Sequence, residues 1–132
     1  MNSKLIFGLS LFGLAMAFAT VYFISSSVEP FCWLAVFIIS AIQVAKHAMR
    51  KYFLHGFLIS ILNCIWMTWV HISMLTIYLA HHSKEAAYYA KLNREIGMTP
   101  IMTMIVMAPF IALFSGLILG LFSTIAKGLY DD

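Results

Sequence analysis

Four long runs of apolar residues, separated by short polar connections, constrain this chain more than any other feature of its sequence. The runs cover residues 5–24, 30–47, 53–79 and 100–126. A bilayer core is about 30 Å thick, so a helix needs roughly 20 residues to cross it. A shorter run can still span if its flanking side chains reach back to the interface. We therefore expect a single all-α transmembrane domain over residues 1–132, an integral membrane four-helix bundle.

The composition favours lipid over water as the solvent. Hydrophobic residues make up 63% of the 132 residues and charged residues only 10%, whereas soluble domains average about half and about a quarter. A small soluble fold buries only about two-thirds of the surface that its unfolded chain exposes. The remaining apolar surface of this chain needs a non-aqueous environment, so the sequence predicts a multi-pass membrane protein with the lipid bilayer as its first partner.

Basic residues lie at the ends of the apolar runs. Lys46, Arg50 and Lys51 follow the second run, whereas Lys4 and Lys127 flank the first and the last. Cytoplasmic loops carry an excess of Lys and Arg, so we expect both termini on the cytoplasmic side. This placement also accounts for the net charge of +3, and no basic stripe with interleaved aromatic residues indicates a nucleic-acid partner.

The first run also has the charged start and apolar stretch of a signal peptide, and Ala15-Met16-Ala17 resembles a cleavage site. The run is long for the apolar part of a signal peptide, so we expect a retained helix. An even number of crossings then places both termini on one side.

A polar connector over residues 81–98 separates the third and fourth runs. Ser83 suits the start of a helix and Gly97 suits its end. We expect a short helix over residues 84–96 that lies at the outer membrane surface. An ordinary solvated connector is the alternative.

Small residues recur at every fourth position in the last two runs. Because lipid is as apolar as leucine, membrane helices associate through close backbone approach and interhelical hydrogen bonds. The last run carries Ala108, Ala112, Gly116, Gly120, Thr124 and Gly128, and the third run carries Gly56, Ser60, Cys64 and Thr68. We expect these two stripes to pack together. The alternative is that the stripe of the last run faces a second copy or another subunit.

Polar residues within the apolar runs are the usual place to look for function in a membrane protein. Ser40, Gln43 and Asn63 fall at similar depth, and we expect one hydrogen-bonded cluster, with a ligand or lipid site as the alternative. His71 lies farther outward, level with Thr20, to which it can hydrogen-bond. A structural hydrogen bond is our interpretation of His71; a haem or quinone site and a proton relay are the alternatives.

Familiar catalytic motifs are absent from the sequence. It contains no P-loop, no HExxH and no GxSxG. Neither Cys32 nor Cys64 belongs to a CxxC or zinc pattern, and the adjacent pair His81-His82 would point in different directions on a helix. We therefore predict no catalytic residue, no metal site and no bound cofactor.

These observations predict a non-enzymatic membrane protein that acts by helix–helix association, as a homo-oligomer or as an accessory subunit of a membrane complex. One alternative is a small oligomeric transporter or channel in which Gln43, Asn63 and His71 line the path. A further alternative is a haem- or quinone-associated redox subunit that uses His71.

The chain resembles a family of small four-helix proteins of the bacterial inner membrane, catalogued as a domain of unknown function. The resemblance rests on Phe37-Ile38-Ile39 before Gln43, on the basic turn over residues 46–51, on Gly56, and on Pro109 followed by residues 116–127. The connector over residues 81–98 departs from the family because it is shorter and less acidic. The resemblance implies a location in a bacterial inner membrane, without an activity or functional residues.

Overall fold

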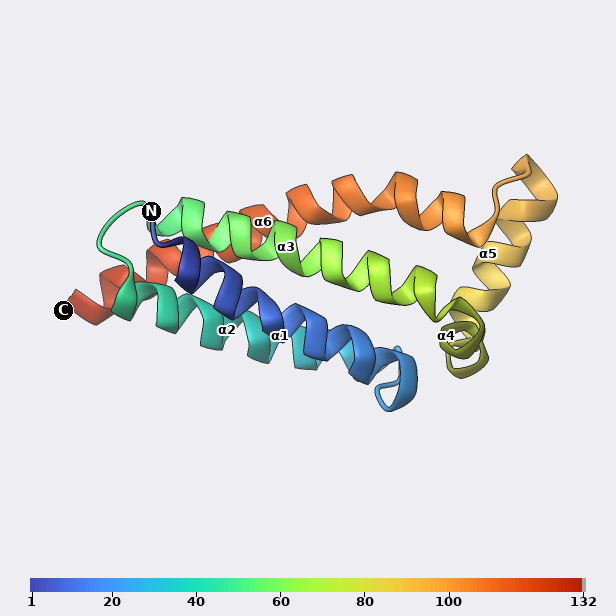
Figure 1. The fold of residues 1–132 in the computed structure, drawn as a ribbon, viewed down its shortest axis with the longest axis horizontal. Coiled ribbons are helices and arrows are strands. Elements are labelled where there is room, and N and C mark those ends of the chain that lie inside the picture. The colour runs from blue at the N-terminus through green and yellow to red at the C-terminus, as the bar shows by residue number, and fades with distance from the viewer. Residues whose placement is uncertain (132) are drawn as a thin grey trace.

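The computed structural model describes residues 1–131, and all regular structure within them is α-helical. The helices are α1 (Ser3–Tyr22), α2 (Glu29–His47), α3 (Tyr52–Ser73), α4 (Leu75–His81), α5 (Ser83–Ile96) and α6 (Pro100–Asp131). The long helices α1, α2, α3 and α6 run back and forth, and both termini lie at one end of the molecule (Figure 1). The short helices α4 and α5 lie at the opposite end.

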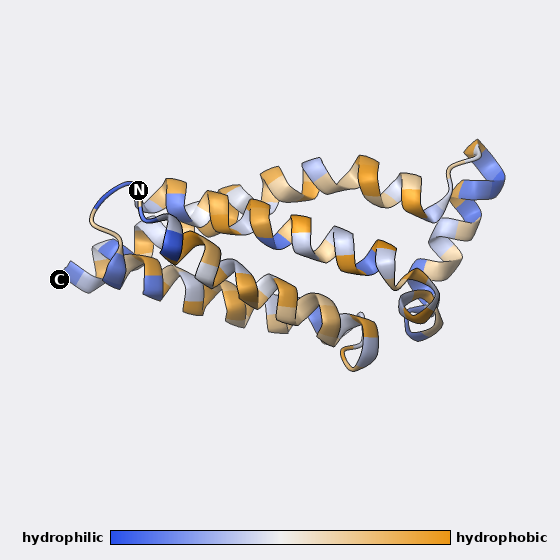
Figure 2. Ribbon diagram, viewed as in Figure 1, coloured by the Kyte–Doolittle hydropathy of each residue, from blue (hydrophilic) through white to orange (hydrophobic). Residues whose placement is uncertain are grey.

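Each of the four long helices is long and apolar enough to cross a membrane. Hydrophilic residues gather at the ends of these helices and along α5 (Figure 2). Large apolar side chains remain exposed on α6, among them Phe110 at 65% and Phe114 at 70%. The expectation of an all-α chain with four apolar helices of spanning length is confirmed.

The contact between α3 and α6 is the most extensive in the fold, and glycines make it close. A Cβ atom on Gly56 would lie 2.5 Å from the Leu119 carbonyl oxygen, and one on Gly120 would lie 2.8 Å from the Phe53 ring. Cβ atoms in proteins essentially never come within 3.0 Å of such atoms. Only glycine therefore permits this separation of the two helices.

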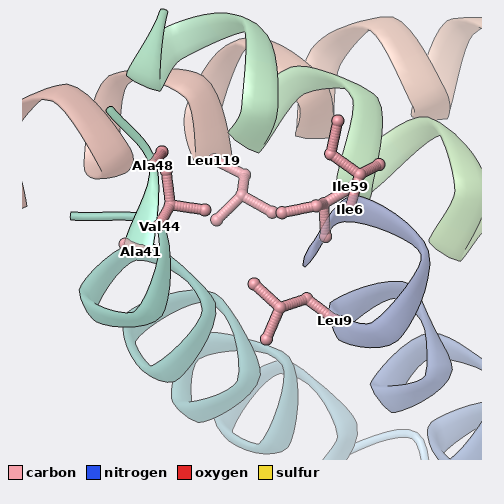
Figure 3. Packing of buried hydrophobic residues seen from close by; sticks show 7 residues of the cluster. All are labelled: Ile6, Leu9, Ala41, Val44, Ala48, Ile59 and Leu119. Atoms are coloured by element: carbon pink, nitrogen blue, oxygen red, sulfur yellow. The ribbon is translucent and has the colours of Figure 1, made fainter. Parts of the chain in front are cut away.

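Two clusters of buried apolar side chains fill the interior, one toward each end. The cluster near the termini joins all four long helices through Ile6, Leu9, Ala41, Val44, Ala48, Ile59 and Leu119 (Figure 3). The second cluster is built from Ala17, Val21, Val70, Tyr78 and Met104, and no residue of α2 belongs to it within the described part of the chain. Helix α2 packs mainly against α6, and four of its five buried residues, Ser40, Ala41, Val44 and Ala45, lie in its second half.

The third apolar run differs from the single helix expected over residues 53–79. Met74 has non-helical dihedral angles, φ −117° and ψ 33°, and it separates α3 from α4. No Pro or Gly marks the break, so the sequence carried no local signal for it. Helix α4 then turns toward α1 and α3, which brings the connector back against the interior.

The expected helix in the connector is confirmed as α5. Gly97 ends it in the left-handed conformation, with φ at 71°. Ser83 does not cap it: His82 occupies the N-cap position, and no side chain there bonds to the first turn.

We expect Gly56→Ala to lower the melting temperature of the detergent-purified protein, because the new methyl group meets the backbone of α6. Overpacking of this kind costs about 1–3 kcal/mol. Gly128→Ala is the matched control, since a Cβ there would have nothing within 4 Å. Equal melting temperatures for the two variants would contradict the close packing of α3 and α6.

Candidate functional site

A cavity of about 440 Å³ lies between the first half of α2, the second half of α3 and the first half of α6. Seven of its sixteen lining residues have apolar side chains: Trp33, Phe37, Met67, Met104, Met107, Ala108 and Ile111. Polar side chains interrupt the wall along α3, and Tyr78 and Tyr89 close the end nearest to α4 and α5. The cavity lies where α2 has left the apolar core.

Asn63 is the least satisfied polar group on this wall. Its side chain belongs to a residue that is 2% exposed, and neither Oδ1 nor Nδ2 has a hydrogen-bond partner among the described residues. The backbone of α1 packs directly over it, since a Cβ on Gly13 would lie 2.7 Å from the Asn63 Cα atom. A buried polar group without a partner costs about 1–3 kcal/mol. The Oδ1 atom of Asn63 faces the same glycine and both amide atoms are enclosed, so a molecule in the cavity reaches the amide only if the side chain turns away from α1.

The expected hydrogen-bonded cluster of Ser40, Gln43 and Asn63 does not form. Ser40 is buried, but its hydroxyl has no partner in the described chain, and Gln43 is only half-buried. The sequence predicts how deep a residue lies along its helix, but it does not predict which helices pack against each other. Because α2 packs mainly on α6 and little on α3, equal depth does not bring these side chains together.

The small residues of α3 divide between two roles. Gly56 and Ser60 contact α6, and the Ser60 hydroxyl donates to Ser115 Oγ at 2.8 Å. Cys64 and Thr68 lie one and two turns farther along and line the cavity. Cys64 Sγ also lies 3.7 Å from Ser115 Oγ on α6, so three residues of the stripe reach α6 as expected, and Thr68 faces the cavity.

Only part of the stripe of small residues on α6 contacts α3. Gly116 and Gly120 are buried against α3, Ala108 lines the cavity and Ala112 is half-buried. Thr124 is exposed, and its expected place in the helix contact is wrong within this chain. A spacing of four residues advances about 40° around a helix at each step, so a long stripe cannot remain on one partner.

His71 makes the hydrogen bond that was expected with Thr20, at 2.8 Å between Nε2 and Oγ1. The Thr20 hydroxyl donates its hydrogen to the Ala17 carbonyl at 2.9 Å. It must therefore accept from His71, which places the ring hydrogen on Nε2. The other ring nitrogen, Nδ1, is an acceptor on a side chain that lines the cavity.

His82 is buried, although the sequence singled it out only as half of the adjacent pair His81-His82. It is 1% exposed, and its Nε2 donates to the Thr20 carbonyl at 2.6 Å. Its Nδ1 lies 2.8 Å from Ser26 Oγ, and Ser26 donates to Glu85 Oε2 at 2.9 Å. Since Ser26 has one hydrogen and a carbonyl only accepts, both nitrogens of His82 act as donors. The arrangement places the His82 ring 3.8 Å from the Glu85 carboxylate.

Tyr78 separates the two histidine rings. It stacks on His71 at 4.1 Å between ring centroids and on His82 at 4.3 Å. Burial raises the pKa of the Tyr78 hydroxyl above its usual value, so this residue stays neutral. The intervening ring keeps His71 and His82 from flanking one haem iron. Sequence reasoning missed the burial of His82 because an unbroken helix over residues 53–79 would carry it away from His71.

Comparisons of the chain with models of protein families, with curated proteins and with solved structures yield no match. The resemblance to a bacterial membrane protein family therefore stays a prediction, and the function is inferred from the geometry.

We expect His82→Ala to destabilise the protein by about 1–3 kcal/mol, because it leaves the Thr20 carbonyl and the Ser26–Glu85 pair without their donor. His81→Ala is the matched control, since His81 is exposed and bonds only to the Ile77 carbonyl of its own helix. The measurement is thermal unfolding in detergent. Similar losses in the two variants would contradict a structural role for the buried network.

Proposed function

We propose that this chain is a non-enzymatic multi-pass membrane protein that binds a small amphipathic molecule in the cavity between α2, α3 and α6. The observation that carries the proposal is the cavity of about 440 Å³ itself, whose lining residues include Asn63, a residue with a buried and unpartnered amide. In an apolar environment such a group is costly unless a partner reaches it. A bound molecule with one hydrogen-bonding group supplies that partner.

The character of the cavity agrees with this role. Ligand sites in proteins are usually concave and mostly apolar, with a few polar groups that fix orientation, and they span about 300–1,000 Å³. The cavity of about 440 Å³ has this composition, with Asn63 and His71 as hydrogen-bonding groups on an apolar wall. Because its wall consists largely of the apolar helices, a ligand would enter from the hydrocarbon.

The proposal keeps part of the transporter interpretation. Asn63 and His71 line the cavity, whereas Gln43 does not belong to its wall. A transporter built on this site would use the first two residues and not the third. The haem interpretation gains no second histidine, because both ring nitrogens of His82 are in hydrogen bonds and Tyr78 separates this ring from His71.

The membrane orientation belongs to the same proposal. Lys4, Lys46, Arg50, Lys51 and Lys127 gather at the end of the molecule that holds both termini. The excess of positive charge there favours the cytoplasmic side for this end. The cavity then lies in the opposite half of the membrane, and a bacterial inner membrane is the location that the family resemblance suggests.

A second candidate function is association with a second copy or with a larger membrane complex. The observation that favours it is the part of the α6 stripe that α3 does not cover. Thr124 and Gly128 are exposed, and a Cβ on Gly128 would meet nothing within 4 Å. Small residues on an open helix face allow another helix to approach closely.

We expect Asn63→Leu to raise the stability of ligand-free protein by about 1 kcal/mol, because it removes an unsatisfied polar group without changing much volume. The same variant should lose the small molecule that co-purifies with the parent protein, as measured by mass spectrometry of extracts. Gln43→Leu is the control, since this amide is not part of the cavity wall. Equal small-molecule content in parent and Asn63→Leu would count against the proposed site.

For the association candidate, we expect light scattering in mild detergent to give a mass above that of one chain. Thr124→Phe should reduce this mass, because a large side chain blocks close helix approach. Leu113→Phe is the control on another exposed position of the same helix. A monomeric parent protein without a co-purifying partner would remove this candidate.

A further inference from the structure

We propose that the ligand of the cavity is an organic cation, an amine or quaternary ammonium with an apolar body, whose charged group lies against Glu29. This inference rests on the proposed function and names the chemical class of its ligand. It is carried by the charges and aromatic rings at the end of the cavity nearest to α4 and α5.

Glu29 is the one carboxylate on the cavity wall, and no lysine or arginine of the described chain lines it. No basic residue among positions 1–131 forms an ion pair with Glu29. The cavity therefore presents one carboxylate and no fixed positive charge, and a cation beside Glu29 would stabilise the ionised form that burial disfavours. Such a site disfavours carboxylates and phosphates and favours a cation.

The neighbouring charges do not cancel that of Glu29. His82 and Glu85 both lie within electrostatic range of Glu29, but these two residues form a pair with each other through Ser26. His82 and Glu85 act on Glu29 in opposite directions. The position of Glu29 in the first turn of α2 also stabilises its negative charge through the helix dipole.

Aromatic side chains surround this carboxylate. The Trp33 indole donates to Glu29 Oε1 at 3.3 Å, which fixes the ring beside the charge. Tyr89 lines the same end of the cavity, and burial raises the pKa of its hydroxyl, so it stays neutral. A cation is attracted to the faces of such rings, most strongly to tryptophan. A carboxylate beside Trp and Tyr is therefore a suitable binding site for an ammonium group.

The remainder of the cavity suits the apolar body of the same ligand. Phe37, Met67, Met107 and Ile111 continue the wall away from Glu29. Methionine adapts its shape to irregular apolar groups. Asn63 offers a single polar contact within this region, which a hydroxyl, ether or amide on the ligand can meet.

The test uses three small probes of similar length on the full chain in non-ionic detergent, with binding measured by equilibrium dialysis against empty micelles. The probes are phenethyltrimethylammonium as the cation, phenylbutanol as the neutral molecule and phenylbutanoate as the anion. We expect saturable binding of the cation and none of the anion. Glu29→Gln should weaken cation binding by about tenfold or more and leave phenylbutanol binding unchanged.

Two further variants keep this test interpretable. Glu29→Asp retains the charge and should restore much of the cation binding. Glu95→Gln, at an exposed site on α5 that pairs with Lys91, should bind the cation as the parent does. Unchanged cation binding in Glu29→Gln, or equal binding of the anion, overturns the inference. Binding of phenylbutanol alone overturns the inference and leaves the proposed function in place, whereas binding of none of the probes removes both.

Discussion

The close backbone contact between α3 and α6 is the constraint on which the rest of this structure depends. Gly56 on one helix and Gly116 and Gly120 on the other leave no room for a Cβ atom. Between apolar helices in a membrane, lipid offers no hydrophobic force, and van der Waals contact at short range holds such helices together. The other long helices attach to this pair, α1 to α3 and α2 to α6.

The cavity follows from the way in which α2 attaches. Ala41, Val44 and Ala48 hold the second half of α2 in the core near the termini. Toward Glu29, α2 no longer reaches the second apolar cluster, which α1, α3, α4 and α6 fill by themselves. Protein interiors are usually packed without space for a small molecule. The opening therefore reflects a helix that is fixed at one end only, and its position is set by the α3–α6 contact.

The sequence predicted those features of the fold that follow from a regular spacing of residues along a helix. Apolar runs located all four long helices, and the small residues Gly56, Ser60, Gly116 and Gly120 lie in the α3–α6 contact. The pairing of His71 with Thr20 followed from equal depth. Each of these features depends on spacing along one helix, or on depth in two of them.

The features that the sequence did not predict depend on how each helix is rotated about its axis and on contacts between residues distant in sequence. Thr124 lies outside the expected contact because residues spaced by four rotate gradually around a helix. Ser40 has no hydrogen-bond partner within residues 1–131 because α2 packs mainly against α6. The break at Met74 carries no Pro or Gly. The buried contacts of Tyr78 and His82 with α1 and α3 stabilise that turn. Such contacts become visible only when the chain is folded.

The polar groups of the cavity are ordered along its length, and this order gives a ligand one orientation. Glu29, Trp33 and Tyr89 lie toward the end with α4 and α5, where hydrophilic residues gather. Asn63 lies about two turns from His71, deeper along α3. A charged group keeps most of its hydration at the Glu29 end of the cavity. An apolar group has no hydration to lose, so it can occupy the region around Asn63 without that cost. A molecule that is polar at one end and apolar at the other would thus fit with its polar end toward α4 and α5.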